Sequence, residues 1–202
     1  MESSKLIALL LAALVSTMLV AANTNQVNPQ KGLPEKIEQS LIGSKRAVDS
    51  KQAADPNQKV PLILQTNSAN CGLASLAMLL SYYSGTPVSL ASLERTATIL
   101  LSASSKRWRA EGYSVGELQS LASAYGMPIR AARIGAAELK SLTFPLLAWI
   151  DLGSTGHFTV VQSFQDGEVS LADPTRGYLR LGKAMWDRLW LKGDTGIVLF
   201  VD

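Results

Sequence analysis

The sequence predicts an α+β domain in which helices come first and a mostly antiparallel sheet follows. Two features of the apolar residues support this prediction. Between residues 71 and 125 they recur every three or four positions, the spacing of one face of a helix. After Gly126 and Pro128 they form short runs separated by turn residues, as strands do. Helices followed by strands along one chain are typical of the α+β class.

Three helices are expected in the first half of this domain. The first covers residues 71–83 and ends before Gly85 and Pro87, because neither residue favours continuation of a helix. Its apolar face consists of Leu73, Leu76, Ala77, Leu80 and Tyr83. The other two helices are expected at 89–102 and 114–125, the latter stopped by Gly126.

The second half is expected to supply the strands. The expected strands cover residues 129–133, 145–150, 157–164, 168–172, 178–181 and 196–201. A helix is expected at 183–189, before the last strand. The pair Asp166-Gly167 is a turn signal, so 157–164 and 168–172 are predicted to form a hairpin.

The amino-terminal segment has the pattern of a secretory signal. Residues 6–22 are almost purely apolar, Lys5 precedes them and Val20-Ala21-Ala22 provides a small-residue exit. We expect residues 1–22 to be a cleaved signal peptide, with no stable membrane insertion afterwards. The alternative is an uncleaved signal anchor, because about 17 apolar residues approach the length that spans a bilayer.

A polar segment separates this signal from the domain. Residues 23–59 are rich in Asn, Gln, Lys, Ser and Pro and poor in aromatic residues, so they cannot bury enough surface to order themselves. We interpret them as a flexible linker or pro-segment. A short docking helix at 34–42 is the alternative, since three apolar residues there share one helical face. The folded domain is expected to cover residues 60–202.

Composition excludes several classes of function. The 202 residues carry a net charge of only +3, and Lys and Arg are scattered along the chain, so nucleic-acid binding is not indicated. A single cysteine rules out an intramolecular disulfide and a cysteine-based zinc cluster. A single histidine argues against a histidine-dominated metal site. We therefore expect no metal and no cofactor.

The single cysteine, Cys71, lies where a polar loop meets the first helix. Unpaired N–H groups and the helix dipole at such a position stabilise a thiolate and lower the thiol pKa. Gly72 would let a substrate approach closely. The alternative is an inert buried thiol, which is what most free cysteines are.

The single histidine, His157, lies where a small-residue loop turns into an apolar strand. A cysteine nucleophile needs an imidazole that pairs with the thiolate and protonates the leaving amine, and a third group must orient that imidazole. Asp173 is the candidate for this role, because the predicted hairpin brings its end back beside His157. Simple turn chemistry at Asp173-Pro174 is the alternative.

Gln65 is the fourth candidate site residue. It lies six residues before Cys71, so its side-chain amide could join the Cys71 backbone N–H in an oxyanion hole. A plain polar loop residue is the alternative, and spacing alone leaves both open.

Together these residues resemble the bacteriocin-processing, double-glycine leader peptidases, a papain-like family of cysteine peptidases. The similarity covers about residues 60–202. It rests, in order along the chain, on Gln65, residues 70–79 (NCGLASLAML), Tyr82-Tyr83, residues 156–161 (GHFTVV), Asp173-Pro174 with Gly177, and Trp190 with Gly193. The resemblance implies a papain-like fold with Cys71 as nucleophile, His157 as base, Asp173 as orienting residue and Gln65 as oxyanion donor.

The sequence departs from the family pattern in two places. Family members usually carry an acidic residue before the cysteine, where this chain has Asn70, and a glycine after the tyrosine pair, where it has Ser84. Neither departure touches the four implied site residues. The family domain is often fused to an export transporter, whereas the signal-like segment here indicates a stand-alone periplasmic member.

The resemblance implies an exported cysteine endopeptidase that cuts after small, Gly-Gly-like residues in an unfolded or leader segment of a secreted protein. Its partners would be that peptide or protein substrate and components of a secretion system, such as one that exports functional amyloid. Two alternatives remain. One is a module that holds the substrate for a secretion apparatus without cutting it. The other is a hydrolase of peptidoglycan stem peptides.

Overall fold

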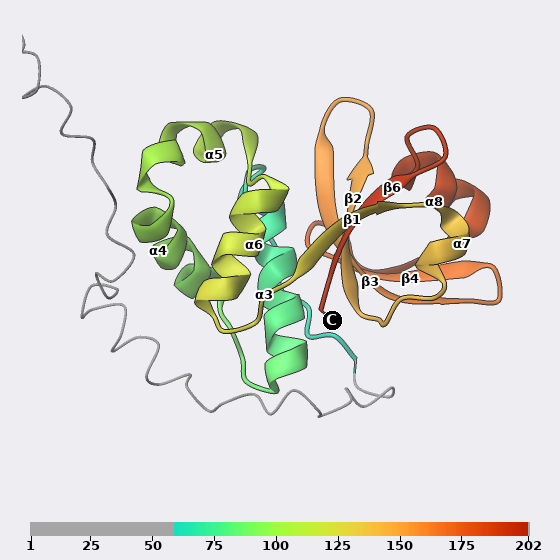
Figure 1. Ribbon diagram of the computed structural model, residues 1–202, viewed down its shortest axis with the longest axis horizontal. Coiled ribbons are helices and arrows are strands. Elements are labelled where there is room, and N and C mark those ends of the chain that lie inside the picture. The colour runs from blue at the N-terminus through green and yellow to red at the C-terminus, as the bar shows by residue number, and fades with distance from the viewer. Residues whose placement is uncertain (1–58, 202) are drawn as a thin grey trace, which may run out of the picture. The chain divides into compact units, whose positions relative to one another are not determined.

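Residues 59–201 are described by the computed structural model, which places a group of helices beside a twisted sheet (Figure 1). The predicted signal peptide at 1–22 lies outside the described residues. So do the alternative helix at 34–42 and all but the last residue of the predicted linker. Within the described part, no helix is both long enough and apolar enough to cross a membrane.

The predicted helices are present, with additions. The helices of the described chain are α3 (Cys71–Ser84), α4 (Leu90–Leu100), the 3-10 helix η1 (Ser102–Ser104), α5 (Ser105–Glu111), α6 (Val115–Ala124), α7 (Ala136–Leu139) and α8 (Lys183–Trp190). The expected boundaries of α3, α6 and α8 are correct to within one residue. The helix expected at 89–102 ends earlier, at Leu100, and α5 and α7 were not predicted.

Helix α3 is the centre of the helical part. Every residue from Cys71 to Tyr82 is buried, because α3 packs against α4 and α6 on one side and against the sheet on the other (Figure 1). Gly85 ends the helix with a φ of 64°, a left-handed conformation that glycine adopts without steric cost. An all-round buried helix holds its first residue, Cys71, in a fixed place.

The sheet confirms the predicted antiparallel arrangement. Its strands are β1 (Arg130–Ile134), β2 (Leu146–Asp151), β3 (Gly156–Gln165), β4 (Glu168–Asp173), β5 (Gly177–Gly182) and β6 (Gly196–Phe200). They are ordered β1-β6-β2-β3-β4-β5, and all neighbouring strands are antiparallel. The expected hairpin of β3 and β4 is present and turns at Asp166-Gly167.

Two apolar clusters cover the two faces of this sheet. One joins α3, α4 and α6 to Phe158 and Leu147 of the sheet. The other packs the stacked rings of Trp186 and Trp190, both from α8, against the opposite face. The sheet is therefore held from both sides, and β3 is fixed between the layers.

Glu117 stabilises the start of α6 and the segment before it. It forms a capping box with Ser114, accepts a hydrogen bond of 2.8 Å from Ser104 and pairs with Arg107. Burial raises the pKa of Glu117, but the hydrogen bonds from Arg107, Ser114 and Ser104 outweigh it and lower the pKa from 4.5 to about 2. The carboxylate thus ties α6 to α5 and η1.

Replacing Glu117 with glutamine is expected to lower the free energy of unfolding by about 1–2 kcal/mol at pH 7. Because the folded-state pKa is depressed, this contribution is present above pH 4.5 and is lost as the pH falls toward 2. Urea unfolding at pH 7 and at pH 3 measures the change, with Glu111→Gln on α5 as the control. An equal difference between wild type and variant at both pH values would contradict this account.

Candidate active site

Cys71 is the first residue of α3, and it is 8% exposed. Asn70 precedes it at the N-cap position, but the Asn70 side chain accepts from the N–H groups of Thr66 and Asn67 instead of capping α3. The N–H groups of the first turn are therefore available to the cysteine and to a bound substrate. Among them, the Gly72 N–H helps to lower the pKa of the Cys71 thiol. This is the setting that favours a thiolate.

His157 is the second residue of β3 and is buried. Its Nε2 lies 2.8 Å from Oδ2 of Asp173, the last residue of β4, which is also buried. The other carboxylate oxygen of Asp173 accepts from the N–H groups of Thr175 and Arg176, each at 2.9 Å. Asp173 is therefore fixed by the turn that follows it and in turn fixes the imidazole of His157.

The side chains of Cys71 and His157 interact, since each shifts the pKa of the other. Because Nε2 of His157 faces Asp173, the remaining nitrogen, Nδ1, faces the sulfur. The backbone N–H of Phe158 also lowers the pKa of the Cys71 thiol. The structure thus brings three of the four sequence-predicted residues together in the order thiol, imidazole, carboxylate.

The protonation equilibria of this group favour an ion pair. Burial raises the pKa of the Cys71 thiol, but the hydrogen bond and charge of His157 and the N–H groups of Phe158 and Gly72 outweigh burial and lower it. Burial lowers the pKa of His157, whereas its bonds to Asp173 and Cys71 raise it to about 9. The pKa of Asp173 stays below its usual value because the bond to His157 outweighs its burial. These shifts together favour a thiolate and an imidazolium over a neutral thiol and imidazole, beside the carboxylate of Asp173.

Gln65 lies beside the turn that holds Asp173. Its Oε1 accepts from the Thr175 hydroxyl at 2.9 Å, and its backbone N–H donates to the Pro174 carbonyl at 2.8 Å. Its Nε2 donates one hydrogen to the Asn67 carbonyl at 2.9 Å. An amide has a second hydrogen to donate. The role of Gln65 as an oxyanion donor stays a prediction.

Two neighbours of the site were not singled out from the sequence. Ser75 lies one turn after Cys71 in α3 and donates to the carbonyl of Phe158 at 3.1 Å, which ties α3 to β3 beside the thiol. The signal in the sequence was a serine within an otherwise apolar helix, and in the structure this serine is fully buried. Gly156 precedes the histidine, and a Cβ there would lie 2.5 Å from the Trp149 ring, so only glycine fits at this position.

No cluster of three or more His, Cys, Asp or Glu side chains that could hold a metal ion occurs within residues 59–201. The cysteine lies at the start of a helix, and the imidazole and the carboxylate lie on the neighbouring antiparallel sheet. This arrangement defines a protein with the papain-like α+β fold.

Comparison with known proteins identifies the family. Residues 59–202 match the model of the Peptidase C39 family, so the chain belongs to that family. It is 33% identical over 144 residues to the probable microcin-H47 secretion/processing ATP-binding protein MchF of Escherichia coli, covering 71% of this chain and 18% of MchF. It is 30% identical over 143 residues to the probable functional amyloid protease FapD of Pseudomonas aeruginosa, covering 69% of this chain and 59% of FapD.

Solved structures agree with the family assignment. A double glycine motif protease from an AMS/PCAT transporter, in complex with the leader peptide, superposes with a TM-score of 0.55 at 29% identity, over 70% of this chain and 90% of that one. The peptidase domain of Streptococcus ComA superposes with a TM-score of 0.56 at 24% identity, over 71% of this chain and 98% of that one. The papain-like fold prediction is confirmed.

Proposed function

We propose that this protein is an exported cysteine endopeptidase that cleaves after a Gly-Gly-like pair in an unfolded or leader segment of a secreted protein. One observation carries the proposal: Cys71 lies at the start of α3 and interacts with His157, which lowers the pKa of its thiol, and Nε2 of His157 lies 2.8 Å from Asp173. Membership of the Peptidase C39 family supports a peptidase. The proteins named as double glycine motif protease and functional amyloid protease support the substrate class.

The proposed reaction uses the side chains in order. The Cys71 thiolate attacks the carbonyl carbon of the scissile bond, and the oxyanion accepts hydrogen bonds from the Cys71 N–H and Gln65 Nε2. Nδ1–H of the His157 imidazolium gives its proton to the leaving amine, which leaves a thioester on Cys71. Neutral His157 then takes a proton from water as the water attacks the thioester, which releases the acid and restores the ion pair.

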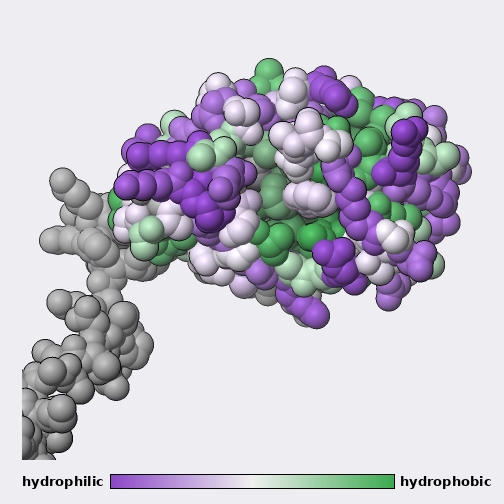
Figure 2. Space-filling view, turned by 90° about the horizontal axis from the view of Figure 1, so that it is seen from above, coloured by the Kyte–Doolittle hydropathy of each residue, from purple (hydrophilic) through white to green (hydrophobic). Residues whose placement is uncertain are grey.

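The surface around the site suits an extended, partly apolar peptide. Figure 2 shows the end of the molecule where α3 begins, with hydrophobic residues gathered in the middle of this face and hydrophilic ones around them. Two exposed leucines adjoin the site in sequence. Leu64 precedes Gln65, and Leu152 lies in the loop that leads to His157. Apolar side chains of an unfolded substrate can be buried on such a face.

Export is part of the proposal and rests on the apolar segment at 6–22. We assign the protein to the periplasm, where it would meet substrates on their way through a secretion system. Fractionation of cells that express the full chain would place the mature protein in the periplasm. Recovery of the full chain in the cytoplasm would contradict this part of the proposal.

Cleavage of a synthetic peptide tests the proposed function directly. A peptide with a Gly-Gly pair between a leader-like and a mature-like half is expected to be cut after the second glycine, and mass spectrometry locates the cut. Cys71→Ala is expected to show no cleavage above background, because the nucleophile is gone. The matched peptide with Val-Val in place of Gly-Gly is expected to resist. Uncut Gly-Gly peptide, bound equally well by wild type and Cys71→Ala, would instead indicate a non-cleaving binding module.

A further inference from the structure

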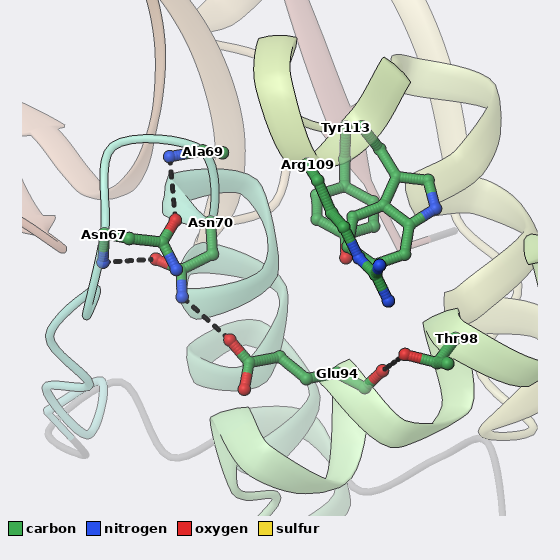
Figure 3. A pocket seen from close by; sticks show the side chains of 8 residues that line it. Asn67, Ala69, Asn70, Glu94, Thr98, Arg109 and Tyr113 are labelled. Atoms are coloured by element: carbon green, nitrogen blue, oxygen red, sulfur yellow. Dashed lines mark hydrogen bonds between the residues drawn. The ribbon is translucent and has the colours of Figure 1, made fainter. Parts of the chain in front are cut away.

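A pocket of about 290 Å³ opens directly beside the loop that carries the nucleophile (Figure 3). Its lining residues come from that loop, from α4 and from α5 with the residues after it: Asn67, Ala69, Asn70, Glu94, Thr98, Trp108, Arg109 and Tyr113. A Cβ on Gly112 would lie 3.2 Å from the Ala69 carbonyl oxygen, so the loop and the segment after α5 run close together. The pocket is thus next to Cys71 but separate from the triad.

One wall of the pocket is aromatic. The rings of Trp108 and Tyr113 stack with centroids 5.0 Å apart and planes 21° apart, and both residues are buried. The Arg109 guanidinium lies 5.0 Å from the Trp108 ring centroid, and Figure 3 shows Arg109 and Tyr113 on the same side of the pocket. This wall is an aromatic pair with a cation over the Trp108 ring.

The pocket presents hydrogen-bonding groups that are not used within residues 59–201. Glu94 accepts at one oxygen from Asn70 Nδ2, at 2.9 Å, and its second oxygen takes no hydrogen bond from the described part of the chain. Arg109 has no carboxylate partner there, and the Tyr113 hydroxyl has no hydrogen-bond partner there. Burial and the charge of Glu94 raise the pKa of Tyr113, so its hydroxyl stays protonated and can donate.

We propose that this pocket is a specificity subsite for a carboxamide side chain, Asn or Gln, of the substrate near the cleaved bond. The carboxamide oxygen would accept from Arg109 and Tyr113, and its NH₂ group would donate to the free oxygen of Glu94. This inference rests on the proposed peptidase function and assigns part of its sequence preference. A carboxamide supplies both a donor and an acceptor without a net charge, and it therefore matches the donors of Arg109 and Tyr113 and the acceptor of Glu94.

The charge balance of the pocket disfavours charged side chains. A lysine or arginine of the substrate would pair with Glu94 but repel Arg109, and an aspartate or glutamate would pair with Arg109 but repel Glu94, so neither charge is favoured by both groups. A purely apolar side chain would leave Glu94, Arg109 and Tyr113 without partners in a pocket it had desolvated. Leaving such groups unpaired costs more than a net hydrogen bond contributes.

Hydrogen bonds connect the pocket to the loop that leads to Cys71. Asn70, the residue before Cys71, donates from Nδ2 to Glu94 at 2.9 Å and to the Thr66 hydroxyl at 2.8 Å. Glu94, which would accept a hydrogen bond from the substrate carboxamide, thus also holds the loop before Cys71 in place. A variant at position 94 must therefore keep the bond to Asn70 if it is to report on substrate recognition alone.

Glu94→Gln meets this requirement. Its Oε1 can still accept from Asn70, while the second oxygen is replaced by an NH₂ donor, so the new amide, Arg109 and Tyr113 would then all offer donors to the substrate. Peptides with Gln, Glu, Lys or Ala, scanned over four positions before and two after the cut, are compared by kcat/KM. Wild type is expected to prefer Gln by about tenfold at one position, the effect of one or two good hydrogen bonds. Glu94→Gln is expected to shift that preference to Glu.

Two further variants sharpen the test. Arg109→Gln is expected to abolish the preference for Gln, whereas Lys106→Gln, the same charge change on an α5 residue that does not line the pocket, leaves it unchanged. Equal rates with Gln, Glu, Lys and Ala at all positions would overturn the inference and leave the proposed peptidase function standing.

If wild type cuts none of the peptides, the proposed function fails and binding decides the subsite separately. The Gln peptide is then titrated into Cys71→Ala, and the Trp108 fluorescence change is isolated by comparison with Cys71→Ala/Trp108→Phe. Tighter binding of the Gln peptide than of the Ala peptide, reversed in favour of Glu by Glu94→Gln, supports the subsite. Binding that does not discriminate among the peptides overturns it.

Discussion

Replacing His157 with alanine is expected to lower kcat/KM for a cleaved peptide by at least about 10⁴-fold at pH 7. The variant loses the cation that stabilises the Cys71 thiolate and the proton donor for the leaving amine, because Nδ1 faces the sulfur and Nε2 is held by Asp173. Steady-state cleavage, together with the thermal midpoint of unfolding, measures the change. A loss below tenfold would contradict the assigned role.

Thr159→Val is the matched control for this prediction. Thr159 lies two residues further along β3, is fully buried, and its hydroxyl has no hydrogen-bond partner in residues 59–201. Removing an unpartnered hydroxyl with little change in volume leaves the fold intact. Thr159→Val is therefore expected to retain wild-type activity and equal or higher stability. A comparable loss of activity in both variants would mean that β3 tolerates no substitution, and not that His157 is catalytic.

Asp173→Asn is expected to lower kcat by about 10²–10⁴-fold with little change in KM. One carboxylate oxygen accepts from His157, and the other accepts from the N–H groups of Thr175 and Arg176. An asparagine cannot serve both sides, because its NH₂ group must face either the imidazole or those N–H groups. Facing His157, it would donate to Nε2 and destabilise the imidazolium.

The pH dependence distinguishes this effect from a loss of structure. With Asp173, the pKa of His157 is raised to about 9, so the imidazolium persists through neutral pH. Asp173→Asn is expected to move the alkaline limb of the kcat profile to lower pH. Asp166→Asn, the same chemical change in the exposed turn of the same hairpin, is expected to leave it in place. An unchanged profile in Asp173→Asn would contradict the orienting role.

The sequence predicted the part of the site that depends on local pattern. The alternation of apolar residues and the turn at Asp166-Gly167 specified the hairpin, and the hairpin brings Asp173 beside His157. The helical period and the polar loop before it specified that Cys71 begins α3. Only the resemblance to a family placed Cys71 beside the His157–Asp173 hairpin, because no local pattern determines that the start of α3 packs on the start of β3.

Other features depend on contacts that no local pattern carries. Among the described side chains of helix α5, only Trp108 is buried, so the helix lacks the apolar period that reveals a helix. Strand β6 inserts between β1 and β2, a choice made by packing of the whole sheet. The pocket beside Cys71 unites Glu94 and Arg109 from two separate helices, and neither stood out in the sequence.

The pH dependence of Cys71 alkylation tests the central claim most directly, because the chain contains no other cysteine. The full-length protein and its His157→Ala variant are treated with a small alkylating reagent from pH 4 to 9, and the labelling rate is followed by mass spectrometry. The account predicts fast labelling of wild type well below pH 8. In the His157→Ala variant, the labelling rate is expected to rise only as an ordinary thiol ionises, with a pKa of about 8.5. Identical profiles that both follow an ordinary thiol would contradict a thiolate–imidazolium pair.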